Sequence, residues 1–168
     1  MTLLKKIAGA LALSVLAIGP VAAQGYPDRA INLIVPWGAG GGTDATGRII
    51  ATLLEKELGQ PVNVINRTGG GGIVGHTEIA YAEPDGYTLG VLTTELSMYN
   101  WTGVSPLNYD NYEALALFNA DPEVVFVPSD GPDIDELLAH IRENPGDIKA
   151  SGANLGGMAH LGWAGVLV

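Results

Sequence analysis

Apolar residues along the chain gather in short runs separated by clusters of glycine, and this pattern predicts alternating strands and helices. The run at residues 31–36 is rich in leucine and β-branched residues and ends at a proline and a glycine cluster, which is typical of a strand buried on both faces. The following segment has the apolar spacing of one helix face: Ile49, Ile50, Leu53, Leu54 and Leu58. We expect Thr43 or Asp44 to cap the start of this helix. Gly59, followed by Pro61, ends it.

The order of strand, glycines and helix then repeats. Residues 62–65 predict a short strand, residues 69–72 form a second glycine run, and residues 73–82 predict a helix that stops at Pro84-Asp85-Gly86. Residues 87–92 predict a third strand. Strands separated by helices of this length predict an α/β fold with a parallel sheet and right-handed crossovers.

The pattern weakens beyond residue 94. Two short apolar runs, at 115–118 and 124–127, are separated by Asp121-Pro122. A helix is predicted at about 133–143, because acidic residues crowd its first turn, where the helix dipole favours them. Residues 148–151 predict a further strand, and a glycine-containing loop then leads into a final apolar stretch. That stretch reaches Val168 without a cap, so we expect an unfinished chain.

The first 23 residues have the pattern of a secretory signal peptide. Lys5 and Lys6 precede an uncharged apolar run at 7–18, and residues 21–23 supply the small side chains of a cleavage site. Twelve residues of helix rise about 18 Å, which is short of the roughly 30 Å hydrocarbon core and disfavours a membrane anchor. We therefore expect export out of the cytoplasm, with a mature chain that begins near Gln24.

Composition narrows the classes of protein that remain. The 168 residues include no cysteine, which excludes disulfides, cysteine-ligated metals and a cysteine nucleophile. The net charge is −10, and the signal segment holds two lysines and no acid, so the mature chain is more acidic still. An acidic surface disfavours nucleic acid and anionic membranes as partners. The three histidines, His76, His140 and His160, are too scattered to predict a metal site.

Glycine loops at helix starts point to anion binding, because free N–H groups and the positive end of the helix dipole meet there. A dinucleotide site is one candidate, since Gly40-x-Gly42-x-x-Ala45 fits the loose glycine fingerprint. That site needs an acid at the end of the second strand, where Asn66-Arg67 stands instead, although Arg67 could favour a phosphorylated dinucleotide. A P-loop is excluded because no glycine precedes Lys-Ser or Lys-Thr at the required spacing.

Capture of a small carboxylate by main-chain amides is the third candidate. It needs only close approach, which glycine permits. Asp44 suits such a site if its carboxylate turns back onto its own helix and away from the ligand. The alternative is that the glycines merely form tight turns between strand and helix. Trp37, beside the first loop, is either a wall of the cleft or part of the core.

Several motifs together resemble the Bug receptors, also called TctC, which are periplasmic solute-binding proteins of tripartite tricarboxylate transporters. The first is Ile31-x-Leu33-Ile34-Val35-Pro36-Trp37-x-x-Gly40-Gly41-x-Thr43-Asp44. The others are Leu58-Gly59-Gln60-Pro61-Val62, Asn66-Arg67-x-Gly69-x-Gly71-Gly72, Pro84-Asp85-Gly86-Tyr87-Thr88-Leu89, Asn144-Pro145-Gly146, Ala150-Ser151-Gly152 and His160-Leu161. The resemblance covers the whole mature chain in register.

The resemblance implies a type II periplasmic-binding-protein-like (Venus flytrap) architecture without enzymatic activity or cofactor. Such a receptor closes on a small organic acid and delivers it to membrane permease subunits, and we expect it to be monomeric. Domain 1 would span residues 24–118 and the start of domain 2 residues 119–168. Because family members are about twice as long, domain 1 would be largely present and domain 2 incomplete, with an exposed sheet edge and apolar face.

The resemblance also implies the site residues. The first loop would grip one carboxylate through main-chain groups beside Trp37: Ala39, Gly40, Gly41, Gly42, Thr43 and Asp44. Two further loops would face the ligand across the cleft, with Thr93, Thr94 and Glu95 in one and Ser151, Gly152, Asn154, Gly156 and Gly157 in the other. Glu95 departs from the small residues common in the family, and an acid there would repel a second carboxylate or select a ligand with a donor. A solute sensor for signalling and a nucleotide-cofactor enzyme remain alternatives to a transport receptor.

Overall fold

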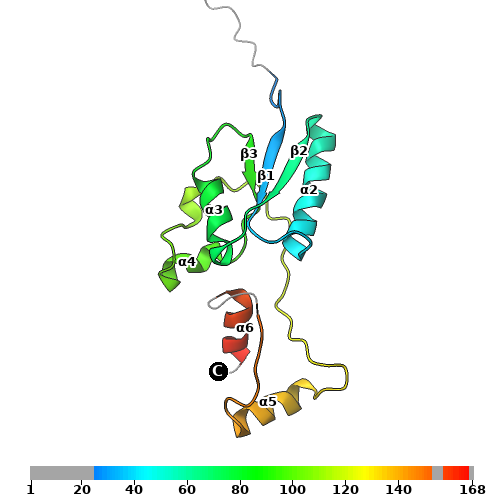
Figure 1. The fold of residues 1–168 in the computed structure, drawn as a ribbon, viewed down its shortest axis with the longest axis vertical. Helices are drawn as coiled ribbons and strands as arrows, with labels where there is room; N and C mark the ends of the chain where they lie inside the picture. Colours follow the sequence, from blue (N-terminus) through cyan, green and yellow to red (C-terminus); the bar gives the residue numbers. More distant parts are fainter. Residues whose placement is uncertain (1–24, 153–156, 167–168) are drawn as a thin grey trace, which may run out of the picture.

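The computed structural model describes residues 25–152 and 157–166 (Figure 1). Its centre is a sheet of three parallel strands in the order β2-β1-β3. The strands are β1 (Ile31–Val35), β2 (Val62–Asn66) and β3 (Thr88–Gly90). The predicted α/β fold with a parallel sheet is therefore confirmed. The predicted signal peptide lies outside the described residues.

Helices cover both faces of this sheet. Figure 1 shows α2 (Gly42–Leu58) and α3 (Ile73–Ala80) on opposite sides of it. Alternate residues of β1 pack in one core cluster with Ala51 of α2, while Ile34, only 2% exposed, points to the opposite face. β1 is thus buried on both faces, as its run of apolar residues predicts.

Short helices follow the sheet segment. A turn of 3-10 helix, η1 (Gly70–Gly72), precedes α3, and α4 (Leu96–Thr102) and η2 (Tyr109–Asn111) follow β3. The pattern of apolar residues did not predict α4. Its two buried residues, Leu96 and Tyr99, are spaced as one helix face and pack with Leu107 in a second core cluster.

Two further helices lie beyond residue 118: α5 (Ile134–Glu143) and α6 (Met158–Val166). Asp133 caps α5, because its side chain accepts a hydrogen bond from the Glu136 amide while the Glu136 side chain accepts one from the Asp133 amide. The predicted helix at about 133–143 is confirmed. No described helix has the length and apolarity needed to cross a membrane.

The strand predicted at residues 148–151 is wrong. Residues 148–152 are exposed and belong to no sheet in the described chain. A β-branched residue favours a strand only where a neighbouring strand can pair with it, and none of the described strands pairs with this segment. The apolar runs at 115–118 and 124–127 are likewise outside any helix or strand, with Leu117 and Phe126 each 88% exposed.

An N-terminal clamp, made of residues 26–29, fastens the chain to the turn before β3. The Tyr26 hydroxyl donates to the Gly86 carbonyl at 2.6 Å, and the rings of Tyr26 and Tyr87 meet edge to face at 5.2 Å. Arg29 pairs with Asp85 at 2.8 Å and lies over the Tyr87 ring. The clamp lies at the amino-terminal edge of the sheet, where β1 and β3 begin.

Candidate functional site

The candidate site lies at the carboxyl-terminal edge of the sheet. Because the strands are parallel, the segments after β1, β2 and β3 all emerge at this edge, where open α/β sheets bind ligands. The segments are the first glycine loop at residues 37–41, the second glycine run at 69–72, and the third loop at 91–95. Figure 1 shows that this edge faces the side on which α5 and α6 lie.

The first glycine loop leads directly into α2. The helix begins at Gly42, and its N-cap is Gly41, in extended conformation and without a side-chain cap. The prediction of Thr43 or Asp44 as N-cap is wrong, because the helix begins nearer the N-terminus than expected, with Gly42 already in its first turn. The first intrahelical bond is donated by the Ala45 amide. The amides of Gly42, Thr43 and Asp44 have no acceptor among the described residues.

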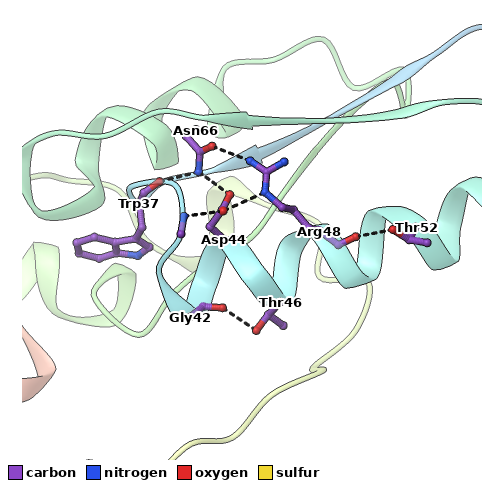
Figure 2. Close-up of polar contacts among 8 residues, drawn as sticks. Trp37, Gly42, Asp44, Thr46, Arg48, Thr52 and Asn66 are labelled. Atoms are coloured by element: carbon purple, nitrogen blue, oxygen red, sulfur yellow. Dashed lines mark hydrogen bonds and ion pairs between the residues drawn. The ribbon is translucent and has the colours of Figure 1, made fainter.

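Asp44 lies in the first turn of α2 with its carboxylate turned inward, as Figure 2 shows. The residue is 3% exposed. One oxygen, Oδ2, accepts from the Gly40 amide at 2.8 Å and from Arg48 Nε at 3.0 Å. The other, Oδ1, accepts from Asn66 Nδ2 at 2.9 Å. The carboxylate therefore turns away from the free amides, as a carboxylate-binding loop requires.

These bonds fix the charge of Asp44. Hydrogen bonds from Arg48, the Gly40 amide and Asn66 hold the pKa of the Asp44 carboxyl well below its usual range. The same contact raises the pKa of Arg48. Asp44 is therefore ionised throughout the physiological range and has no proton to give. Its role in the loop is structural.

Asn66 closes the first glycine loop at both ends. Its Nδ2 donates to the Trp37 carbonyl at 2.9 Å, where the loop begins, and to Asp44, where it ends. Its Oδ1 accepts from Arg48 at 3.3 Å. This is the strand-end position at which a dinucleotide site needs an acid, and here the amide is fully occupied within the protein. Arg67 pairs with Glu78 at 2.7 Å, so it too has a partner within the protein.

Trp37 connects the first glycine loop to the third loop. Its indole nitrogen donates to Thr93 Oγ1 at 3.2 Å, and that hydroxyl donates to Glu95 Oε2 at 2.7 Å. The half-buried ring also packs against the main core cluster. Trp37 is therefore part of the core and part of the candidate site. Thr94 is exposed, and its carbonyl accepts from Ser97.

The remaining predicted residues are placed only in part. Ala39, Gly40, Gly41 and Gly42 are exposed, and Thr43 is half-buried. Ser151 and Gly152 are exposed as well, while Gly157 is buried just before α6. Asn154 and Gly156 lie outside the described residues. No hydrogen bond joins the described residues of this segment to the first glycine loop.

Sequence reasoning missed several residues that build the site. Arg48 lies one helical turn after Asp44, and this opposite-charge spacing is a signal that could have revealed the pair. His76 and Tyr99, which support the third loop, carry no such signal. The three loops emerge at one edge of the sheet, as the parallel strand order requires. Among the described residues, no group of three histidine or acidic side chains could hold a metal ion.

These features define a class. A parallel α/β unit with glycine loops and unpaired amides at its carboxyl edge is a unit suited to bind an anionic ligand. Residues 46–165 match the family model of the tripartite tricarboxylate transporter family receptor, TctC. The chain belongs to this family of periplasmic solute-binding proteins, which are binding proteins and not enzymes.

Individual relatives agree. The chain is 36% identical to a UPF0065 protein of Bordetella pertussis, over 96% of this chain and 50% of that protein. It is 35% identical to Protein BugT of the same species, over 84% of this chain and 45% of that protein. The solved structure of the periplasmic binding protein BugD is 31% identical, with a TM-score of 0.58 over 81% of this chain and 47% of that one. The chain thus spans about half the length of the curated relatives it matches.

Proposed function

We propose that this protein is an extracytoplasmic receptor that captures a small organic acid for the membrane permease of a tripartite tricarboxylate transporter. The observation that carries the proposal is the set of unpaired amides at Gly42, Thr43 and Asp44, at the start of α2, in a chain of this receptor family. Partial positive charge on these N–H groups favours a carboxylate. Asp44 leaves them free because its own carboxylate bonds elsewhere.

The ligand's first carboxylate would lie over the first glycine loop. Residues 38–42 lack side chains larger than a methyl group, so a ligand can approach the main chain closely. Trp37 would form one wall and Thr93 with Glu95 the next. We propose the segment at 151–157 as the opposite wall.

Calorimetry with citrate, succinate, benzoate and aspartate tests this proposal. The matched variants are Gly41→Leu and Gly165→Leu. A Cβ at Gly41 would meet nothing closer than the Gly38 carbonyl oxygen at 3.5 Å, and a Cβ at Gly165 would meet nothing within 4 Å, so both variants should fold. We expect Gly41→Leu to weaken binding of the preferred acid at least tenfold, because its side chain covers the amides, and Gly165→Leu to leave it unchanged. Absence of heat with every acid, or equal affinities in both variants, contradicts the proposal.

Export is the second part of the proposal. It rests on the signal pattern of residues 1–23 and on relatives that are periplasmic binding proteins. The intact mass of the protein from the periplasmic fraction of its host tests it. We expect a mass that corresponds to a chain beginning at Gln24, whereas a chain that retains Met1 contradicts export with cleavage.

A further inference from the structure

His76 is a fully buried polar side chain that the proposed function does not use. It lies on α3 and is 0% exposed. Its Nδ1 lies 2.8 Å from the Tyr99 hydroxyl on α4, and its Nε2 accepts from the Thr93 amide at 3.3 Å. Its carbonyl accepts from the Tyr112 hydroxyl at 2.9 Å. One histidine thus joins α3 to α4, to the third loop and to the segment after η2.

The partners of the ring define its tautomer. The Thr93 amide can only donate, so Nε2 must be the unprotonated acceptor and Nδ1 must carry the proton. The Tyr99 hydroxyl donates its own proton to the Gly71 carbonyl at 2.7 Å, so it can only accept from the ring. The Nδ1 proton is therefore donated to the Tyr99 hydroxyl oxygen. Every polar atom of the imidazole is satisfied in the neutral form with the proton on Nδ1.

This arrangement connects the second glycine run to the third loop. The chain of bonds runs from Gly71 through Tyr99 and His76 to the Thr93 amide, and Thr93 continues through its hydroxyl to Trp37 and Glu95. His76 therefore holds the main chain of Thr93, whose side chain bonds both Trp37 and Glu95. Gly72 leaves room for the hydrogen bond between His76 and Tyr99, since a Cβ there would lie 2.8 Å from the Tyr99 hydroxyl oxygen.

We infer that His76, as the neutral Nδ1–H tautomer, is a positioning residue of the ligand site: it sets the Thr93–Glu95 loop against Trp37 and thereby fixes the wall that faces the bound acid. The inference rests on the proposed function for its meaning, but the positioning itself does not require a ligand.

Protonation of His76 would break this arrangement. A proton on Nε2 would face the N–H of Thr93, two donors in one contact, and the loop would lose its support. The groups that face His76 from neighbouring elements are Glu95 at the start of α4, Tyr99 on α4 and Tyr112 after η2. Burial lowers the pKa of His76 to about 4, and the nearby negative charge of Glu95 opposes this effect only partly. The ring is therefore neutral at pH 7.

The first experiment is nitrogen NMR of the wild-type chain at pH 7.5, without ligand. We expect the His76 Nδ1 to be protonated and Nε2 unprotonated, and the Thr93 amide signal to move when His76 is replaced. A ring protonated on Nε2, or a Thr93 amide that is unchanged in a folded His76→Leu variant, overturns the inference. This result stands whether or not any acid binds.

The second experiment compares citrate affinity in three variants at pH 7.5. His76→Leu removes both hydrogen bonds of the ring, and His76→Gln can still accept from the Thr93 amide and donate to Tyr99. His140→Gln is the control, because His140 is a half-exposed residue on α5 that bonds Asp147. We expect about a tenfold loss for His76→Leu, which corresponds to one net hydrogen bond. We expect His76→Gln to recover most of it and His140→Gln to match wild type.

The outcomes separate the two proposals. If wild type binds no citrate or other acid of the panel, the proposed function fails and the NMR result decides the role of His76. If wild type binds and all three variants bind equally, His76 does not position the site and the inference fails. Loss in His76→Leu with recovery in His76→Gln supports it.

Discussion

Gly75 on α3 packs directly against Pro36 at the end of β1. A Cβ at Gly75 would lie 2.6 Å from the Pro36 Cα and 2.8 Å from the Arg67 carbonyl oxygen. The helix therefore touches the main chain at the ends of both β1 and β2, where the first two glycine segments begin. This close approach holds the two loops at a fixed separation.

Replacement of Gly75 tests this packing. We expect Gly75→Ala to lower the free energy of unfolding by about 1–3 kcal/mol, because backbone must move to admit the methyl group. Gly165→Ala is the matched control, since Gly165 is also helical and has open space around it. Helix propensity predicts that the control is neutral or stabilising by up to about 1 kcal/mol. Urea denaturation of both variants measures the difference, and equal stabilities would contradict the close contact.

His76 predicts a loss of stability in mild acid. The pKa of His76 is lowered to about 4 in the folded protein, while the unfolded chain has the ordinary value of 6.5. The unfolded state therefore binds the proton first as pH falls below 6.5, and stability declines until the folded form also binds it near pH 4. The expected loss over this window is about 3 kcal/mol. Denaturation midpoints from pH 7.5 to 4 measure it, and His76→Gln should remove the contribution.

Asn66 predicts how firmly the first glycine loop is closed. Asn66→Asp would replace both donated hydrogen bonds by a carboxylate beside Asp44 and the Trp37 carbonyl oxygen. We expect unfolding to become easier by about 1–3 kcal/mol at pH 7. Asn63→Asp is the control, because Asn63 lies on the same strand and is exposed. A variant at position 66 as stable as the control would show that the loop closes without this amide.

Glu95 predicts the charge of the preferred ligand. The Thr93 hydroxyl bridges its carboxylate to the Trp37 indole, beside the proposed position of the acid. A ligand with a second carboxylate close to Glu95 loses about 1 kcal/mol to repulsion even in water, so we expect Glu95→Gln to strengthen citrate binding about fivefold. Benzoate, with one carboxylate, should change little. Calorimetry with Glu57→Gln as an exposed control measures the effect, and equal gains for both acids would show that Glu95 does not discriminate.

The sequence predicts the sheet well because β1 carries its information locally. Ile31, Leu33 and Val35 are apolar and lie in the core, and the residue between the last two on the other face, Ile34, is apolar too. An apolar run without polar alternation is typical of a strand buried on both faces, which is a central strand of a parallel sheet. The glycine loops follow from the same pattern. Residues 148–151 have the local preference of a strand but no described strand pairs with them, so local preference alone misleads there.

The candidate site is predicted less fully, because its supports depend on tertiary contacts. The glycines indicate where a ligand could approach the main chain. The inward turn of Asp44, however, depends on Asn66, which is 22 residues away in the chain. Thr93 and Trp37 meet across 56 residues, and nothing in the local sequence around His76 indicates that it joins them. The resemblance to the receptor family pointed to Trp37, Thr93 and Glu95, but not to the residues that hold them.

The N-terminal clamp has a practical consequence for handling the protein. Tyr26 and Arg29 fasten the chain to the turn before β3, at the sheet edge opposite the first glycine loop. An affinity tag placed ahead of the clamp therefore leaves from the far side of the sheet. A biosensor surface that captures the protein by such a tag should present the glycine loops to the solution, and the same attachment point suits a fluorescent fusion.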